Sequence, residues 1–378
     1  MTQTMYKHSN LTEEISETDE EIFKKITSTV LSDDQIQKII QPELIVPNVQ
    51  SVLAIHWHPE YIPMELIQKR IETMFPHKTN ELIIPTQHNV LMEYGKYSGV
   101  EVDCYSHGFD QKVQLLLHFE TSKIKDAVVL KNMLQHTFKY RSSQLFDYIY
   151  TITKPIEHRI QQAVSETAVD QDIIHFVRIY VKKIETLVNN HADHLPDEMI
   201  KNKLIRNFFN ELQPIYGEAY IRRCQSFLNS VKKIVKQNFS LQYFYRTTEI
   251  IEETRSLGGC IVVPHPEQFW PILLADYDID GYEVWNPQSQ RYTRFIISVL
   301  HRTNRYIRKS NHKILVFMGD DTHMGEKILI ATEENKEKMN REIGVQAWND
   351  MLIQKELSIG NITVDNVIEE YKHRLSAA

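Results

Sequence analysis

The stretch "VLAIHWHPE" places His56 and His58 two residues apart at the end of an apolar run. Residues two apart on a β-strand point to the same side, so both imidazoles can face one metal ion. The chain has 17 histidines among 378 residues. At that density an H-x-H pair is expected by chance ~0.8 times. The pair gains meaning only from other potential ligands.

Further potential ligands recur near the carboxyl ends of the later apolar runs. They are His88, Glu101, His118, His265, Asp321 and His323. In barrels of parallel strands these ends meet at one face, where side chains converge on one site. A single structural zinc needs only four ligands, whereas imidazoles mixed with carboxylates suit two or three ions of zinc, manganese or iron. The pattern favours a multinuclear catalytic centre that polarises a phosphoryl oxygen and lowers the pKa of bound water.

Six short motifs occur in a recognisable order along the chain. They are "IHWHPE", "IIPTQHNVL", "GVEV", "VVPHP", "GYEVWN" and "MGDDTH". This series resembles the polymerase and histidinol phosphatase (PHP) family of metal-dependent phosphoesterases, in which the patterns are H-x-H, T-D-H, G-x-E, H-P, G-x-E-x-x-N and G-S-D-x-H. The resemblance covers about residues 51 to 120 and 257 to 326, and it implies a distorted seven-stranded β/α barrel.

The resemblance also implies roles for individual residues. Metal ligands would be His56, His58, His88, Glu101, His265, Asp321 and His323, and the family's remaining histidine would correspond to His118 or, on the same strand face, to Gln114. His265 or His323 would assist proton transfer. Glu283 and Asn286 match a motif that lies beside the family's site.

Two positions depart from the family pattern. Gln87 stands where the family has an aspartate, and Pro59-Glu60 replaces the small hydroxyl residue that often follows H-x-H. Either change would weaken one metal position or alter the attacking water.

The pattern of apolar and polar residues along the chain predicts the strands and helices that position these residues. Seven candidate strands are "SVLAIHW", "ELIIPT", "GVEVDCY", "KVQLLLHF", "GGCIVVPH", "GYEVWN" and "HKILVFMG". We expect an α/β protein with a distorted (β/α)7 barrel, a large helical insertion and helical N- and C-terminal extensions. The expected parts are a helical extension at 1–50, barrel at 51–120, helical insertion at 121–256, barrel at 257–326 and a helical segment at 327–378.

Composition and charge narrow the classes of function. The net charge of −7 gives no reason to expect nucleic-acid binding, and no apolar run approaches a membrane span. The N-terminus lacks the layout of a signal peptide, so we expect a cytoplasmic protein without a membrane partner. Cys104, Cys224 and Cys260 form no C-x-x-C motif and are expected to be packing residues.

Two other clusters have ordinary interpretations. His191, Asp193 and His194 lie in the helical region, where a turn and cap role is favoured over a metal site. A basic group precedes the last strand and consists of Arg291, Arg294, Arg302, Arg305 and Arg308. Most of it is expected to be a solvated helix face, but Arg291 and Arg294 could contact a substrate phosphate.

These observations predict a hydrolase that uses two or three divalent ions to cleave a small phosphomonoester or a nucleotide. One alternative is a non-catalytic relative that binds metal or a protein. The presence of Gln87 in place of the family's aspartate favours this alternative. Another is an amidohydrolase-type barrel, which also begins with H-x-H but generally has a bridging lysine where Glu101 stands here. The helical insertion is expected to flank the mouth of the barrel as a cap, and the sequence does not define the oligomeric state.

Overall fold

The computed structural model describes residues 11–306, 312–329 and 335–377. The chain divides into two compact units, one formed by residues 1–30 and 139–240 and the other by 31–138 and 241–378. The helices at 128–138 and 247–256 belong to the second unit. Among the described residues, no helix combines the length and apolar character needed to cross a bilayer.

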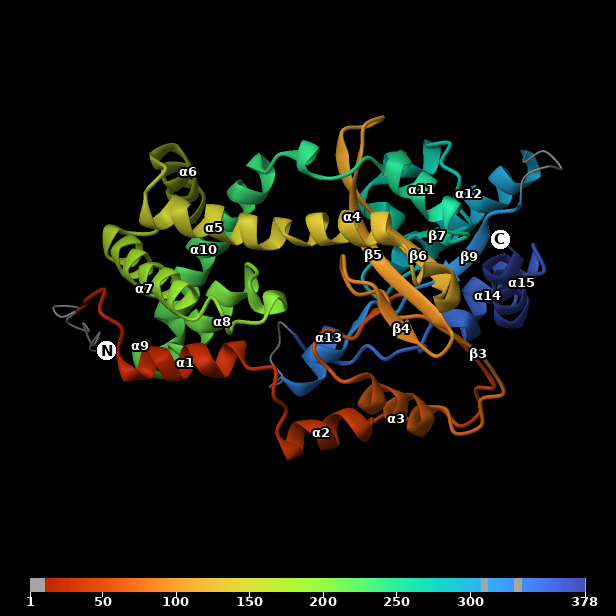
Figure 1. The fold of residues 1–378 in the computed structure, drawn as a ribbon, viewed down its shortest axis with the longest axis horizontal. Coiled ribbons are helices and arrows are strands. Elements are labelled where there is room, and N and C mark those ends of the chain that lie inside the picture. Colours follow the sequence, from red (N-terminus) through yellow and green to blue (C-terminus); the bar gives the residue numbers. More distant parts are fainter. Residues whose placement is uncertain (1–10, 307–311, 330–334, 378) are drawn as a thin grey trace. The chain divides into compact units, whose positions relative to one another are not determined.

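The first unit is built of helices. They are α1 (Glu17–Thr27), α5 (Tyr140–Thr153), α6 (Glu157–Thr167), α7 (Gln171–Asn190), α8 (Lys203–Glu211), α9 (Gln213–Tyr216) and α10 (Glu218–Asn238). The side chains of Ser16 and Asp170 accept hydrogen bonds from the first turns of α1 and α7, which fixes where these helices begin. The apolar faces of α5, α7 and α10 are buried within this unit (Figure 1).

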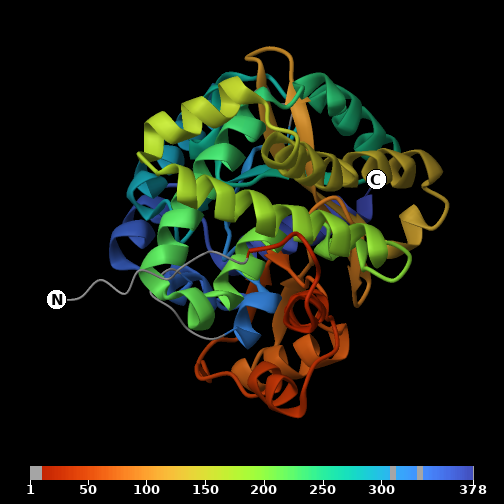
Figure 2. The same cartoon turned by 90° about the vertical axis from the view of Figure 1, so that its left-hand side faces the viewer.

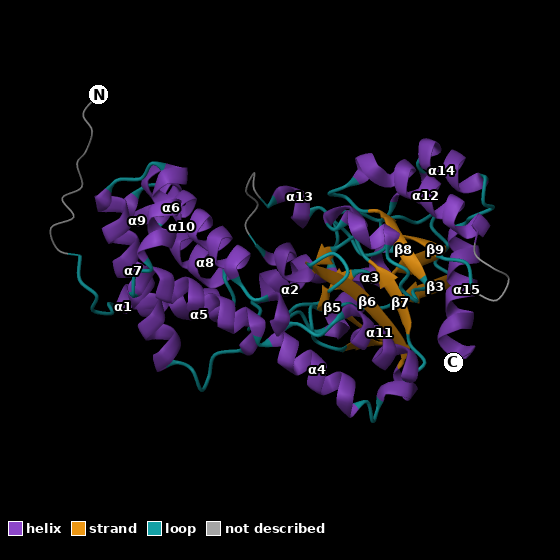
Figure 3. Ribbon diagram, turned by 90° about the horizontal axis from the view of Figure 1, so that it is seen from above, coloured by secondary structure: helices purple, strands orange, loops and turns teal. Residues whose placement is uncertain are grey.

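The second unit contains all the strands of the described chain, coloured orange in Figure 3. They are β1 (Ser51–Ala54), β2 (Trp57–His58), β3 (Asn80–Ile83), β4 (Met92–Tyr94), β5 (Tyr97–Ser106), β6 (Gln111–Glu120), β7 (Cys260–Val263), β8 (Gly281–Trp285), β9 (Leu315–Met318) and β10 (Thr322–His323). Every one of the seven expected strands is present. The short strands β2, β4 and β10 were not predicted as separate elements.

Helices cover these strands. They are α2 (Asp33–Ile40), α3 (Met64–Met74), α4 (Val128–Phe138), α11 (Thr247–Ser256), α12 (Thr293–Tyr306), α13 (Lys336–Met339), α14 (Met351–Ser358) and α15 (Val364–Ala377). The start of α2 is fixed by a capping box, since the Ser32 hydroxyl accepts a hydrogen bond from the Gln35 amide and the Gln35 side chain accepts one from the Ser32 amide.

The strands fall into three sheets. The largest has the order β4-β5-β6-β7-β8-β9, and the others are the pairs β1-β3 and β10-β2. The pairs β1-β3, β10-β2, β7-β8 and β8-β9 are parallel, whereas β4 through β7 pair antiparallel. The α/β class is therefore confirmed, but a closed seven-stranded barrel is not found among the described residues.

The difference from a barrel of parallel strands has a local cause. The strands β5 and β6 are joined by the four residues 107–110, and so short a connection permits only an antiparallel pair. The two strands form a long ribbon, visible in orange in Figure 1 and Figure 2. Isolated backbone hydrogen bonds link the separate sheets, including Thr86 N to Trp57 O at 2.8 Å and Asp321 N to His56 O at 2.9 Å.

The large sheet has two differently covered faces. One face belongs to a buried cluster with α4, α11, α12 and α14, to which the sheet contributes residues such as Val102, Leu117 and Val263. The other face contributes Leu116, Val262 and Phe317 to a cluster with α15. Successive side chains of a strand alternate between the two faces of the sheet. Glu101 and Glu283 therefore lie on the same face as the residues that pack against α15.

Candidate metal centre

Four histidines of the site are placed by backbone pairing near the edge where the sheets meet. His58 ends β2, and His323 ends β10, which pairs with β2 in register. His88 forms an isolated parallel bridge with Glu101 of β5. His56 precedes β2, and its carbonyl accepts the amide hydrogen of Asp321. Residues far apart in sequence are thus brought to one edge by main-chain hydrogen bonds.

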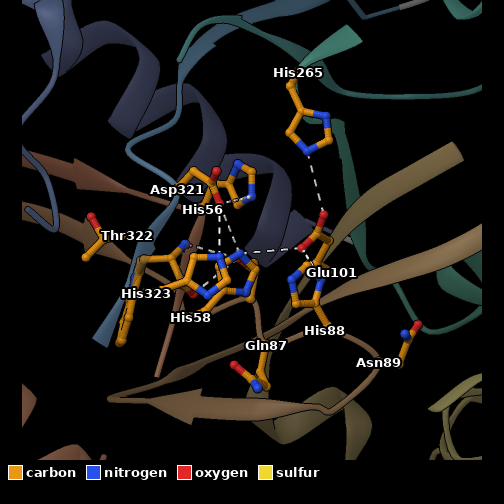
Figure 4. Close-up of polar contacts among 12 residues, drawn as sticks. His56, His58, Gln87, His88, Asn89, Glu101, His265, Asp321, Thr322 and His323 are labelled. Carbon is orange, nitrogen blue, oxygen red and sulfur yellow. Dashed lines mark hydrogen bonds and ion pairs between the residues drawn. The ribbon is translucent and has the colours of Figure 1, made fainter. Parts of the chain in front are cut away.

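Three groups of side chains among the described residues could each hold a metal ion. They are His58, His88 and His323; His56, His58 and Asp321; and His56, Glu101 and His265. Within each group the ligand atoms lie within 4.8 Å of one another. His58 belongs to the first two groups and His56 to the last two, so the groups form one continuous cluster (Figure 4).

Asp321 lies among three imidazoles. Its Oδ1 is 3.7 Å from His56 Nε2, 3.4 Å from His58 Nε2 and 3.5 Å from His323 Nε2. Its Oδ2 instead accepts hydrogen bonds from Gln288 Nε2 at 2.6 Å and from Arg341 Nη1 at 2.9 Å. One carboxylate oxygen therefore faces the histidines and the other faces side-chain donors.

Glu101 plays a similar part on the opposite side of the cluster. Its Oε2 is 2.6 Å from His88 Nδ1 and 3.5 Å from His58 Nε2, and its Oε1 is 3.7 Å from His265 Nε2. The side chain is buried. A buried carboxylate between imidazoles from three other segments can serve more than one metal position.

Glu283 of β8 organises two histidines without belonging to any of the three groups. Its Oε1 is 2.8 Å from His56 Nδ1, and its Oε2 accepts a hydrogen bond from the His265 amide at 2.6 Å. A Cβ on Gly319 would lie 1.1 Å from Glu283 Oε1. Gly319 is therefore required for the close approach of this carboxylate, and Glu283 fixes which nitrogen of His56 faces the cluster.

The electrostatics differ between neighbouring imidazoles. Burial alone would lower the pKa of His56, but the Glu283 carboxylate, aided by Asp321 and Glu101, raises it to about 10. Burial lowers the pKa of His58 to about 3, and the charges of the adjacent His323 and His88 act in the same direction. In the metal-free protein the protonated form of His56 is therefore favoured by its carboxylate neighbours.

The carboxylates and the remaining imidazoles are shifted toward their charged forms. Burial works against ionisation of Glu101 and Asp321, yet the neighbouring imidazoles hold the pKa of both carboxyls well below the usual range. Burial likewise opposes charging of His265 and His323, but nearby carboxylates raise the pKa of both. The site is therefore a compact set of anionic oxygens and basic nitrogens, as a divalent cation requires.

Backbone strain is concentrated near this cluster. Among the described non-glycine residues, a positive φ occurs at Glu60 (53°), Asn89 (55°), His265 (28°) and Asp321 (48°), and at three positions elsewhere. Such conformations cost about 1–3 kcal/mol each and persist where the surroundings enforce them. Two of the four residues are themselves potential ligands, which indicates that their side chains are aimed at the expense of local stability.

Unpaired buried atoms support the fit of a metal to this site. Neither ring nitrogen of His58 makes a hydrogen bond, and His56 Nε2 and His265 Nδ1 also make none. The His58 ring stacks between His88 and His323, with centroid distances of 4.3 and 4.2 Å. Buried polar atoms are normally paired, so buried ring nitrogens without a hydrogen bond fit ligands of a cation. The nitrogen and oxygen donors present, with no cysteine in the three groups, suit borderline divalent ions.

His118 is not brought into the cluster. Its Nε2 is 3.1 Å from the Ile55 carbonyl and its Nδ1 is 2.7 Å from the Tyr371 hydroxyl, so both nitrogens are used within the protein. The prediction assumed that its strand was parallel to the others, which would place His118 at the ligand edge. Because β6 runs antiparallel to β5, His118 pairs with Gly99, two positions below Glu101. Gln114, the alternative to His118, pairs with Asp103, two positions after Glu101, and belongs to none of the three groups.

Gln87 and Glu60, which lie at the two positions that depart from the family pattern, contact one another. The Gln87 side-chain oxygen accepts a hydrogen bond from the Glu60 amide at 3.1 Å. Glu60 Oε1 in turn is 3.5 Å from His323 Nδ1. Figure 4 shows the Gln87 amide lying away from the imidazoles. Gln87 thus supports the strained turn at Glu60, and Glu60 places a carboxylate beside His323.

Residues proposed for other roles lie elsewhere. Arg294 is exposed and pairs with Glu356, while the guanidinium of Arg291 lies over the Tyr292 ring. Neither belongs to the three groups found among the described residues, and their contact with substrate stays a prediction. Arg308, of the same basic group, lies outside the described residues.

The remaining clusters have the expected roles. Cys104, Cys224 and Cys260 are free and buried. His191 caps the C-terminus of α7, contacts Glu20 and stacks on Phe23, in the first unit. The turn and cap interpretation of this histidine is confirmed.

Sequence reasoning missed residues that position members of the cluster. Glu283 was recognised only as a neighbour of the site, although its G-x-E motif is a usable indication. Gln288 follows that motif closely. Arg341 lies after the last motif, in a segment with no pattern that points to the site, and the sequence offered no means of finding it.

Comparisons with known proteins identify a similar solved structure. No family model matches the sequence, and no curated protein matches it. A crystal structure of a protein from Bifidobacterium adolescentis, described as a "putative metal-dependent phosphoesterase", is similar with a TM-score of 0.40 and 14% identity, covering 83% of this chain and 97% of that chain. A TM-score of this size carries no argument about function, so the interpretation rests on the geometry of the site.

Proposed function

We propose that this chain hydrolyses a phosphate ester, either a small phosphomonoester or a nucleotide, at a centre of two or three divalent ions. The observation that carries the proposal is the continuous cluster of three overlapping ligand groups joined through His56 and His58. A single structural ion would leave several of these buried donors without a partner. The motifs that resemble the PHP family point to the same chemistry.

The residues divide into those that hold cations and those that orient them. The holding residues would be His56, His58, His88, Glu101, His265, Asp321 and His323. When bound, zinc, manganese or iron ions would supply Lewis acidity for a phosphoryl oxygen and acidify a water molecule. Glu283 orients His56 through its Nδ1, and Glu60 lies beside His323 Nδ1. Carboxylates in these positions fix the tautomer of a ligand histidine.

Proton transfer is assigned to His265 or His323. His323 is one of the less deeply buried members of the cluster, with its side chain 19% exposed. A carboxylate contacts each ring, Glu101 for His265 and Asp321 for His323, and raises its pKa. Whichever of the two rings does not hold an ion can donate a proton to the departing alkoxide oxygen.

The experiment is phosphate release from an aryl phosphate and a panel of nucleotides, with protein loaded with manganese, zinc or iron. His58→Ala and Asp321→Asn are expected to abolish the metal-stimulated rate. His191→Ala is the matched control because this histidine has a helix-cap role, and its rate is expected to stay within about threefold of the unmodified protein.

A protein that binds the ions but releases no phosphate from any member of the panel would contradict the proposal. That result would favour a non-catalytic metal-binding protein. An inactive His191 variant beside a normal His58 variant would show that the site had been placed in the wrong unit.

A further inference from the structure

The carboxylate oxygen of Asp321 that faces away from the histidines, Oδ2, accepts two hydrogen bonds. Arg341 Nη1 donates to Asp321 Oδ2 at 2.9 Å, and Gln288 Nε2 donates to the same oxygen at 2.6 Å. The Arg341 side chain is only 4% exposed, whereas Gln288 is exposed. The buried and permanently charged partner of this oxygen is therefore the arginine.

The segment that carries Arg341 is itself held from two sides. Lys327 Nζ donates to the carbonyl of Met339 at 2.6 Å and to that of Arg341. The next residue, Glu342, accepts two hydrogen bonds from Arg70, at 2.9 and 2.6 Å, and pairs with Lys327 at 2.9 Å. A buried ion-pair network of this kind costs desolvation and is a weak source of stability. It does fix the position of the backbone from which Arg341 reaches Asp321.

A carboxylate whose second oxygen accepts no such hydrogen bond can rotate or bind a metal through both oxygens. With Oδ2 occupied by a guanidinium, only Oδ1 is directed at His56, His58 and His323. The hydrogen bond also stabilises the negative charge that a cation requires. Partners of this kind typically change metal affinity by about 10- to 100-fold when they are removed.

We infer that Arg341 is a positioning residue of the metal centre, which holds Asp321 as a one-oxygen ligand and makes the segment at 339–342 part of the site. This inference rests on the proposed function for its catalytic consequence. Its consequence for metal binding does not depend on the substrate.

The test is calorimetric titration of metal-free protein with manganese or zinc, alongside phosphate release. Arg341→Gln is expected to weaken the binding of at least one ion by about 10- to 100-fold, and Arg341→Lys, which keeps the charge but loses the fork of donors, by less. Where phosphate release is measured, kcat is expected to fall while KM stays within about threefold. Arg223→Gln is the matched control, since this arginine is exposed and pairs with Asp170 in the first unit.

A cycle with Asp321→Asn gives a further check. If Arg341 acts through Asp321, the loss of affinity caused by Arg341→Gln should shrink in the Asp321→Asn background. Thermal unfolding of the metal-free variants shows whether each is folded, and Arg341→Lys serves as the test variant should Arg341→Gln not fold.

Two outcomes would overturn the inference. The first is unchanged affinity for every ion in Arg341→Gln. The second is a rise in KM with unchanged metal affinity, which would make Arg341 a substrate-binding residue. A wild-type protein that binds the ions without releasing phosphate would count against the proposed function only, because the titrations still measure the effect of Arg341.

Discussion

His58 and His118 are both fully buried, and burial lowers the pKa of each to about 3. Their surroundings differ in one respect. His118 uses both ring nitrogens, with the Ile55 carbonyl and the Tyr371 hydroxyl as partners, in the layer of the sheet that packs on α15. His58, at the edge where three sheets meet, makes no hydrogen bond through either nitrogen.

The difference separates a structural histidine from a candidate ligand. Burial and pKa are the same for the two rings, so neither property identifies a metal site. What distinguishes them is whether the lone pairs and N–H groups are already satisfied by the protein. A satisfied ring stabilises the fold, whereas a ring without hydrogen bonds beside two carboxylates is suited to be a metal ligand.

Matched substitutions test this contrast most severely. His58→Gln is expected to weaken binding of at least one ion by more than about 100-fold, because it removes a ligand shared by two groups. His118→Gln is expected to leave metal stoichiometry and affinity unchanged. Titration of the two metal-free variants with zinc or manganese measures both effects. Equal losses of metal affinity in the two variants would show that His58 and His118 do not differ as candidate ligands.

A second substitution disturbs the site without touching a ligand. Gly319→Ala would place a methyl group 1.1 Å from the present position of Glu283 Oε1. Glu283 must then move away from His56 and the His265 amide, so metal affinity is expected to fall by about 10- to 100-fold. Gly108→Ala is the control, since a Cβ there has no atom within 4 Å. Unaltered metal binding in Gly319→Ala would show that Glu283 does not orient the ligands.

Stability should show the reverse ranking of the two histidines. In the metal-free protein, His118→Gln is expected to lower the free energy of unfolding by about 1–3 kcal/mol, because the buried Tyr371 hydroxyl and Ile55 carbonyl lose their partners. His58→Gln breaks no hydrogen bond and should change it by less than about 1 kcal/mol. Chemical denaturation measures both. A larger loss for His58→Gln would contradict the assignment.

The smallest expected effect is a dependence on pH. The pKa of His118 is about 3 in the folded protein against 6.5 for an ordinary histidine, so between these values the unfolded chain binds the extra proton. The contribution of His118 to stability is complete above pH 6.5 and falls as the pH is lowered, by up to about 1.4 kcal/mol per pH unit. Unfolding of metal-free protein from pH 7 to pH 5 should therefore show a shallower slope in His118→Gln. Parallel slopes would indicate that His118 is not held neutral.

The sequence was sufficient for the elements that have strong local patterns. All seven expected strands were found, because short apolar runs between polar segments identify strands well. The pairing of His56 with His58 on one side followed from strand geometry, and both lie in the cluster. His265 and Asp321 were predicted because the carboxyl ends of parallel strands meet at one edge, and both lie in the cluster.

The remaining features depend on pairings that the sequence does not encode locally. His118 was placed among the ligands because the direction of β6 was unknown, and a four-residue turn reverses it. Arg341 reaches Asp321 only through contacts between segments separated by many residues, including the network of Arg70, Lys327 and Glu342. The predicted role of the helical region as a cap beside the site stays a prediction.

The central claim is that the unsatisfied imidazoles and carboxylates hold more than one cation. It is tested most directly by elemental analysis of protein purified without chelator, followed by titration of the metal-free protein. The account predicts at least two divalent ions per chain, because the donors of the three groups exceed a single coordination sphere. Less than one ion per chain, with no uptake of manganese, zinc or iron on titration, would contradict it.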